Sequence, residues 1–305
     1  MTPNDNSSAE RCGFVAVLGI PNSGKSTLVN AMVGTKVSIV SPKVQTTRMR
    51  IRGIAISDDT QIILADTPGI FKPKRRLDRA MVAAAWGETE EADAVMLVVD
   101  AARGFSDETK AIIAGLEAKK QKTILVLNKI DLVSNRNNLL QLVAEAKDNP
   151  IFSDIFMISA ATGECVEDLK KFLASKMPYG PWMFPKDDVS DLPLRMLAAE
   201  ITREKVFLFL HEELPYNITV ETTSWQEKPD GSTRIEQTIF VERESQRKIV
   251  LGSKGSKIKT IGMAARKEIE AAIDGSVHLF LHVKVAENWE DDPRRYRNLG
   301  LDFNA

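Results

Sequence analysis

Residues 19–26 read Gly19-Ile20-Pro21-Asn22-Ser23-Gly24-Lys25-Ser26, which fits the phosphate-binding P-loop pattern G-x-x-x-x-G-K-S/T. The apolar run Phe14–Leu18 before it predicts a buried strand, and Ser26–Met32 after it predicts the start of a helix, as the motif requires. Backbone N–H groups and the helix N-terminus would then face phosphate oxygens. We expect Lys25 to contact the β- and γ-phosphates, Ser26 to ligate Mg²⁺, and Thr27 to belong to the same site.

Composition sets the broad class of the protein. The 305 residues suit about two domains, 43% of them are hydrophobic, and the formal net charge is −1, so any basic surface must be local. The two cysteines, Cys12 and Cys165, form no disulfide framework or metal-ligand spacing. Residues 1–10 lack the apolar region of a signal peptide, and no apolar run is long enough to span a membrane. We expect a cytoplasmic monomer.

The first half of the chain alternates strand-like and helix-like runs. Apolar strands near residues 15–18, 62–65, 95–99, 124–127 and 156–158 are separated by helical stretches, which predicts an α/β fold with a mostly parallel, six-stranded sheet and helices on both faces. The runs 49–57 and 60–65, joined by Asp58-Asp59, predict a hairpin and hence one antiparallel edge strand.

A proline-rich stretch, residues 177–185, interrupts this alternation and predicts a domain boundary. We expect a disordered N-terminus at 1–10, a first domain at 11–178, a linker at 179–192 and a smaller α+β domain with a C-terminal tail at 193–305. In the second domain we expect a helix at 194–214, a hairpin of 217–224 with 235–241, helices at 245–251 and up to about 273, and a last strand at 277–285 whose odd positions face the core.

Asp66-Thr67-Pro68-Gly69 follows an apolar strand and predicts the magnesium- and γ-phosphate-sensing segment of a nucleotide switch. The Asp66 carboxylate would hold Mg²⁺, and the Gly69 N–H would contact the γ-phosphate. The polar run 44–48 lies between this segment and the P-loop, and one threonine in it should complete the Mg²⁺ shell; we favour Thr47 over Thr46, although the sequence does not separate them. The predicted metal ligands are therefore Ser26, Thr47 and Asp66.

Asn128-Lys129-Ile130-Asp131 follows another strand, at the sheet edge where ligands of open α/β folds bind. Asp131 can accept both guanine donors, N1–H and N2–H₂, whereas adenine offers no such pair. Asn128 and Lys129 would support the base, and the backbone of Ser159-Ala160 would reach guanine O6. The sequence thus predicts a GTP and GDP site.

Two residues bear on the rate of hydrolysis. Ile70 stands where many GTPases have a glutamine that orients the attacking water, and its side chain cannot hydrogen-bond water, so we expect slow hydrolysis. Asn22 predicts a K⁺ ion beside the phosphates, by similarity to other loops of the G-x-P-N-x-G-K-S type. The predicted catalytic residues are Asn22, Lys25, Thr47 and Gly69.

The second domain carries its own glycine motif, Gly252-Ser253-Lys254-Gly255, between two helical segments and beside a hairpin. This is the signature of a KH domain, here of type II, in which the loop clamps a single-stranded nucleic-acid backbone. Residues 242–267 contain eight basic and two acidic side chains, a local charge of +6. We expect RNA to contact Gly252, Ser253, Lys254, Gly255, Lys257, Ile258 and Lys259.

Together these motifs, with the stretches A-A-E-I-T-R-E-K and E-L-P-Y, closely resemble the Era family of bacterial GTPases from about Cys12 to Asp302. The resemblance implies slow GTP hydrolysis, binding of the 16S rRNA 3′ end, and assistance to assembly and maturation of the 30S subunit. It also implies a cytoplasmic protein with peripheral association at the inner membrane. Two alternatives stay open: a signalling or cell-cycle GTPase whose second domain binds protein or membrane, and a P-loop kinase or ATPase.

Overall fold

The computed structural model describes residues 10–43, 46–210 and 218–305, and its contacts divide the chain into two compact units. The predicted disordered N-terminus lies, apart from Glu10, outside the described residues. The first unit comprises residues up to Ser38, Thr47–Asp191 and Leu299–Ala305, and the second comprises Ile39–Thr46 and Leu192–Asn298. By their contacts, Leu299–Ala305 group with the first unit, and the predicted domain boundaries stay a prediction.

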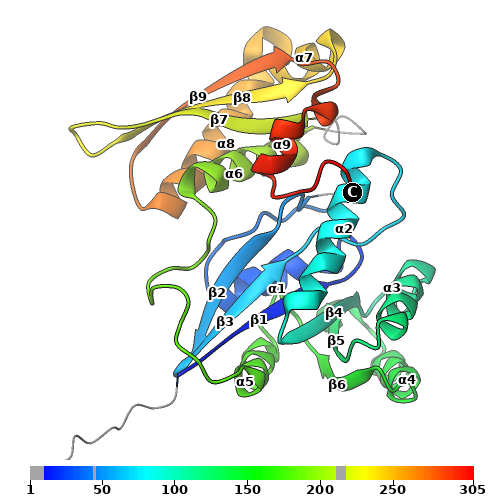
Figure 1. Cartoon of the computed structure of the whole chain (residues 1–305). Helices are drawn as coiled ribbons and strands as arrows, with labels where there is room; N and C mark the ends of the chain where they lie inside the picture. The colour runs from blue at the N-terminus through cyan, green and yellow to red at the C-terminus, as the bar shows by residue number, and fades with distance from the viewer. Residues whose placement is uncertain (1–9, 44–45, 211–217) are drawn as a thin grey trace, which may run out of the picture. The chain divides into compact units, whose positions relative to one another are not determined.

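The first unit is built on a six-stranded sheet of order β2-β3-β1-β4-β5-β6 (Figure 1). Only the β2–β3 pair is antiparallel, which confirms the predicted mostly parallel sheet and its edge hairpin. The strands are β1 (Arg11–Leu18), β2 (Ile51–Ser57), β3 (Thr60–Asp66), β4 (Ala94–Asp100), β5 (Thr123–Asn128) and β6 (Phe152–Met157).

Helices cover both faces of this sheet because side chains on a strand alternate between faces. Val15 and Val17 of β1 pack in one core with α1 (Lys25–Val33) and α5 (Val166–Lys176). Ala16 and Leu18 point the other way, into a second core shared by α2 (Arg76–Glu91), α3 (Asp107–Ala118) and α4 (Arg136–Lys147). The carboxyl ends of β1, β3 and β5 lie at one edge of the sheet, and the nucleotide motifs follow these strand ends.

The predicted linker, residues 179–192, is hydrogen-bonded to the first unit. The buried Gln61 side chain accepts from the Met183 and Phe184 amides, each at 3.0 Å, and donates to the Phe184 carbonyl. Ile54 of β2 donates its amide to the Val189 carbonyl at 2.9 Å. The Ile54 bond gives a partner to a backbone group of the edge strand β2, and the Gln61 bonds give partners to backbone groups of the linker.

The second unit contains a three-stranded sheet of order β7-β8-β9, with β7 antiparallel and β9 parallel to β8. Its order of elements, α-β-β-α-α-β, is that of a type II KH domain. The elements are α6 (Leu194–Phe209), β7 (Ile218–Glu227), β8 (Thr233–Val241), α7 (Glu244–Leu251), α8 (Ser256–Ile273) and β9 (Val277–Val285), followed by α9 (Pro293–Asn298).

Two details differ from the prediction. Helix α6 ends at Phe209, where Leu210 adopts an extended conformation, so the predicted end at residue 214 is wrong, and residues 211–214 lie outside the described part of the chain. Along β9 the odd positions face inward as predicted, except that Val285 at the strand end is exposed. No described helix combines the length and hydrophobicity needed to cross a bilayer.

Candidate functional site

The P-loop connects β1 to α1 and depends on glycine at two positions. Gly19 has φ +150°, and a Cβ there would lie 2.4 Å from the Val98 carbonyl oxygen. Gly24, the N-cap of α1, has φ +98°, and a Cβ there would lie 2.2 Å from Asn128 Nδ2. Both positions therefore exclude side chains. The close packing holds the loop against β4 and the Asn128 loop, and it leaves the helix N-terminus available to phosphate.

Lys25 is buried inside the loop that it closes. Its ammonium donates to the Gly19 carbonyl at 3.2 Å and to the Ile20 carbonyl at 3.0 Å. Burial lowers the pKa of Lys25 to about 8, and the negative charge of Asp66 opposes this change. A phosphate anion beside the ammonium would favour its charged form and raise the pKa again.

Three oxygen-bearing side chains meet at the end of α1, as the sequence predicted for a magnesium site. Ser26 Oγ donates to Asp66 Oδ2 at 2.7 Å and lies 3.0 Å from Thr47 Oγ1. Asp66 is fully buried, and its second oxygen, Oδ1, has no hydrogen-bond partner among the described residues. A buried carboxylate oxygen without a partner, beside two hydroxyls, is a donor set that suits Mg²⁺.

The structure distinguishes the two threonines that the sequence could not. Thr47 reaches Ser26, whereas the Thr46 hydroxyl bonds Ser41 Oγ and the Lys43 carbonyl, each at 2.7 Å. The Thr46 hydroxyl is therefore engaged within its own loop, and Thr47 is the threonine that lies beside Ser26. The other members of the predicted loop, residues 44 and 45, lie outside the described residues.

The segment after Asp66 packs directly on the P-loop. Thr67 donates its hydroxyl to the Val17 carbonyl at 2.7 Å, and the Ile70 amide donates to the Gly19 carbonyl at 3.0 Å. A Cβ on Gly69 would lie 2.6 Å from the Pro21 nitrogen, so glycine is required there too. Ile70 is buried in the apolar core beside Ile20 and cannot orient a water molecule.

Asn128 joins three loops of the predicted base site. Its Nδ2 donates to the Ser23 carbonyl at 3.0 Å, while its Oδ1 accepts from the Lys129 amide at 2.8 Å and the Ala160 amide at 3.0 Å. The Ala160 amide is thus engaged inside the protein. Ser159 is fully buried, and its carbonyl accepts a backbone bond from the Gly163 amide. These contacts make Asn128 the support of the site.

The neighbouring residues of the motif face outward. The Lys129 ammonium donates to the Asn22 carbonyl at 2.6 Å and to Asp100 Oδ2 at 2.7 Å. The Asp131 side chain is exposed, where a base could reach it. Asp100 was not predicted from the sequence, although an acidic residue at the end of an apolar strand was a signal that could have found it.

The glycine loop of the second unit has the backbone conformation that its sequence requires. Gly252 and Gly255 have φ of +72° and +76°, and Lys254 between them is also left-handed. A Cβ on Gly252 would lie 2.7 Å from Lys257 Cβ. The Ser253 and Lys254 side chains are exposed, so the loop presents backbone and charge outward.

A groove of about 380 Å³ begins near this loop and runs between α8 and β9. Its floor and walls combine apolar and basic side chains: Ile258, Lys259, Gly262, Met263, Arg266, Leu279, Phe280 and Leu281. Met263 and Phe280 are 52% and 42% exposed. Neither was predicted from the sequence, although Phe280 is an aromatic residue at an outward-facing position of its strand.

Comparisons with known proteins identify a GTPase domain and a KH domain in this chain. Residues 14–129 match the family model for a 50S ribosome-binding GTPase, and residues 213–290 match the KH domain model. The GTPase Era of Bradyrhizobium sp. strain BTAi1 is 61% identical over 96% of this chain and 95% of its own length. That of Brucella suis is 58% identical over 96% of this chain and 94% of its own length.

Two solved structures are similar over nearly the whole chain. The first is a variant of Aquifex aeolicus Era bound to GDP·AlF₄⁻, and the second is Era with MgGDPNP and nucleotides 1506–1542 of 16S ribosomal RNA. Each has a TM-score of 0.90 and 40% sequence identity, covering 95% of this chain and 99% of the other. This chain and its relatives match over nearly their whole lengths. The match includes the P-loop, the Ser26–Thr47–Asp66 oxygen cluster, the Asn128 loop and the KH unit. The chain therefore belongs to the Era family of GTPases.

Proposed function

We propose that this GTPase is a nucleotide-controlled RNA-binding protein that binds 16S rRNA near its 3′ end and assists maturation of the 30S subunit. In the first unit, Lys25 and the P-loop amides bind the phosphates, and Asp131 selects guanine. Ser26, Thr47 and Asp66 hold Mg²⁺, which neutralises phosphate charge when bound. Gly69 senses the γ-phosphate through its amide.

The magnesium assignment rests on the buried Asp66 Oδ1, for which the described part of the chain supplies no hydrogen-bond partner. Burial raises the pKa of the Asp66 carboxyl, which the Ser26 hydrogen bond and the Lys25 charge oppose. A divalent cation would favour the ionised carboxylate and give the buried oxygen a ligand. Thr47 is the ligand that nucleotide exchange would move, since it comes from a loop and not from the helix or strand.

The RNA proposal is carried by one observation: the glycine loop and the basic, partly apolar groove lie side by side on α8. Backbone at Gly252 and Gly255 permits close approach of phosphate, and Lys254, Lys257 and Lys259 supply positive charge. Phe280 offers an exposed aromatic face for base stacking. The Era complex with nucleotides 1506–1542 of 16S ribosomal RNA supports the identity of the ligand.

The test is binding of an RNA oligonucleotide with that sequence, measured over a range of salt concentrations, with a scrambled oligonucleotide of equal length for comparison. Lys254→Ala should weaken binding and reduce the salt slope by about 0.7, the contribution of one phosphate contact on a single strand. Lys228→Ala, in the β7–β8 turn of the same unit, makes the same charge change outside the loop and should leave the slope unchanged.

Nucleotide control is tested in the same assay. RNA affinity should differ between the protein saturated with GDP and the protein saturated with a GTP analogue, because linkage requires each ligand to affect the other equally. Equal affinity in the two states refutes nucleotide control. Affinity without salt dependence, with Lys254→Ala silent, would favour a signalling GTPase whose second unit binds protein or membrane.

A further inference from the structure

Residues 39–43 and Thr46, which precede Thr47, belong by their contacts to the second unit and hydrogen-bond helix α6 and its C-terminal end. The Val40 amide donates to Glu204 Oε1 at 2.8 Å, and the Lys43 ammonium donates to the Leu210 carbonyl. These residues are therefore bonded to the helix and its C-terminal end, whereas Thr47, the next residue, bonds Ser26 of the P-loop.

At the centre of this contact lies a buried ion pair between Arg203 and Glu200, one turn apart on α6. Their side chains are 2% and 5% exposed. Arg203 Nε donates to Glu200 Oε1 at 2.8 Å, and its Nη2 donates to Glu200 Oε2, so the pairing is bidentate. A guanidinium held at two points, with its carbon 5.1 Å from the centre of the Phe207 ring, has a fixed orientation.

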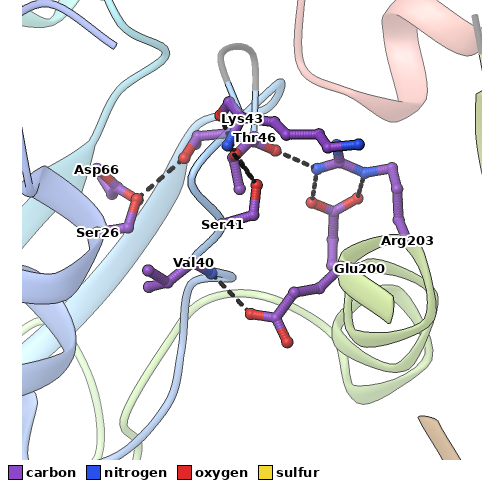
Figure 2. Close-up of polar contacts among 10 residues, drawn as sticks. Ser26, Val40, Ser41, Lys43, Thr46, Asp66, Glu200 and Arg203 are labelled. Carbon is purple, nitrogen blue, oxygen red and sulfur yellow. Dashed lines mark hydrogen bonds and ion pairs between the residues drawn. The ribbon is translucent and has the colours of Figure 1, made fainter. Parts of the chain in front are cut away.

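Arg203 Nη2 also donates to the Thr46 carbonyl oxygen, as Figure 2 shows. That carbonyl is part of the planar peptide bond that joins Thr46 to Thr47. Thr47 Oγ1 lies 3.0 Å from Ser26 Oγ at the metal cluster. Withdrawal of Thr47 from the cluster would turn this peptide plane and so disturb the hydrogen bond between the Thr46 carbonyl and the guanidinium.

We infer that the Glu200–Arg203 pair is a positioning element for the GTP site: it fixes the Thr46 carbonyl so that Thr47 is placed for the magnesium shell of bound GTP. The inference rests on the proposed metal role of Thr47. Loss of the carbonyl leaves a buried charged donor short of a partner, which disfavours the withdrawn state of the loop.

The test removes both charges together, since deleting Arg203 alone would leave Glu200 buried and unpaired. In Glu200→Leu/Arg203→Met, affinity for a non-hydrolysable GTP analogue with Mg²⁺ should fall about tenfold, the size of one hydrogen bond from a charged group, while GDP affinity stays within about twofold. Calorimetry gives both values. Thermal unfolding of each variant establishes that it is folded.

Two further variants make the result specific. Arg195→Met removes an exposed guanidinium from the same helix, which bonds the Thr222 carbonyl, and should leave both affinities unchanged. Thr47→Ala should itself lower analogue affinity, and adding the pair of α6 substitutions to it should cause no further loss, because the pair acts only through Thr47.

Each combination of results has one meaning. An unchanged ratio of analogue to GDP affinity in the α6 variant, with Thr47→Ala impaired, overturns the inference and leaves the metal site intact. Fully additive losses also overturn it, because they place the effect elsewhere. A silent Thr47→Ala refutes the metal assignment and the inference together.

Discussion

Gly24→Ala adds one methyl group at the point where the P-loop meets the base-binding loop. The new Cβ would lie 2.2 Å from Asn128 Nδ2, a distance that no relaxed structure tolerates. The φ of +98° adds a left-handed conformation that disfavours alanine by roughly 1–2 kcal/mol. Relief of the clash requires the Asn128 side chain to move. This movement breaks its hydrogen bonds to the Ser23 carbonyl, the Lys129 amide and the Ala160 amide.

Each of those three hydrogen bonds contributes about 1 kcal/mol, and Asn128 must return to its place for nucleotide to bind. We expect GDP affinity to fall by about 2–3 kcal/mol, which is about 30- to 150-fold. Gly34→Ala is the matched control. Gly34 caps the other end of α1 with φ +85°. Apart from its neighbours in the chain, no atom of the described residues lies within 4 Å of the position that a Cβ would take, so Gly34→Ala carries the conformational strain without the clash.

Displacement titration with a fluorescent GDP derivative measures both variants under identical conditions. Gly34→Ala should bind within about twofold of the parent protein, even if its unfolding temperature drops. Similar losses of affinity in the two variants would mean that backbone strain alone explains the effect. Normal binding by Gly24→Ala would refute the assignment of Asn128 as the support of the base site.

Three further predictions concern the same site. Asp131→Asn should weaken GDP binding by at least about 100-fold and favour xanthine nucleotides, because asparagine can donate to the xanthine C2 carbonyl; unchanged guanine preference in competition binding would contradict this. Turnover should be faster in KCl than in NaCl, and Asn22→Ala should abolish the difference; equal rates for the parent protein would exclude a K⁺ role. GDP binding at pH 8.5 should take up about 0.8 proton, and about 0.2 at pH 7.5, because free Lys25, whose pKa is about 8, is mostly neutral at the higher pH and phosphate restores its charge. Calorimetry in buffers of different ionisation enthalpy measures this uptake, and Lys25→Arg, which stays charged throughout, should show none.

The sign of the Lys25 effect also applies to stability. The Lys25 side chain keeps its proton up to about pH 10.5 in the unfolded chain, but only up to about pH 8 in the folded, ligand-free protein. The unfolded state therefore binds more protons between these values, and the free energy of unfolding should rise with pH there. Below pH 8 the buried, charged Lys25 lowers the free energy of unfolding of the ligand-free protein by its full amount, about 3 kcal/mol. Bound phosphate removes it, which is one physical reason for nucleotide to stabilise the first unit.

Much of the site follows from short stretches of sequence, because their chemistry is local. In the P-loop, positive φ angles and close neighbouring atoms require glycine at Gly19 and Gly24. In the loop of the second unit, positive φ angles favour glycine at Gly252 and Gly255. The alternation of apolar strands and helices predicted the sheet, because burial on both faces needs continuous apolar runs. The end of α6 was mispredicted since its apolar spacing continues past Phe209 while the helical backbone does not.

The sequence by itself determined the P-loop, the N-K-x-D motif at 128–131, the glycine loop at 252–255 and the order of two domains, because each is encoded by residues adjacent in the chain. Only the tertiary structure decided that Thr47 and not Thr46 lies beside Ser26 and Asp66, that Asn128 connects three loops, and that Asp100 pairs with Lys129. It also showed that Arg203 bonds Thr46, 157 residues away in the chain. Such pairs depend on how separate elements pack, and no local preference of either residue specifies its distant partner.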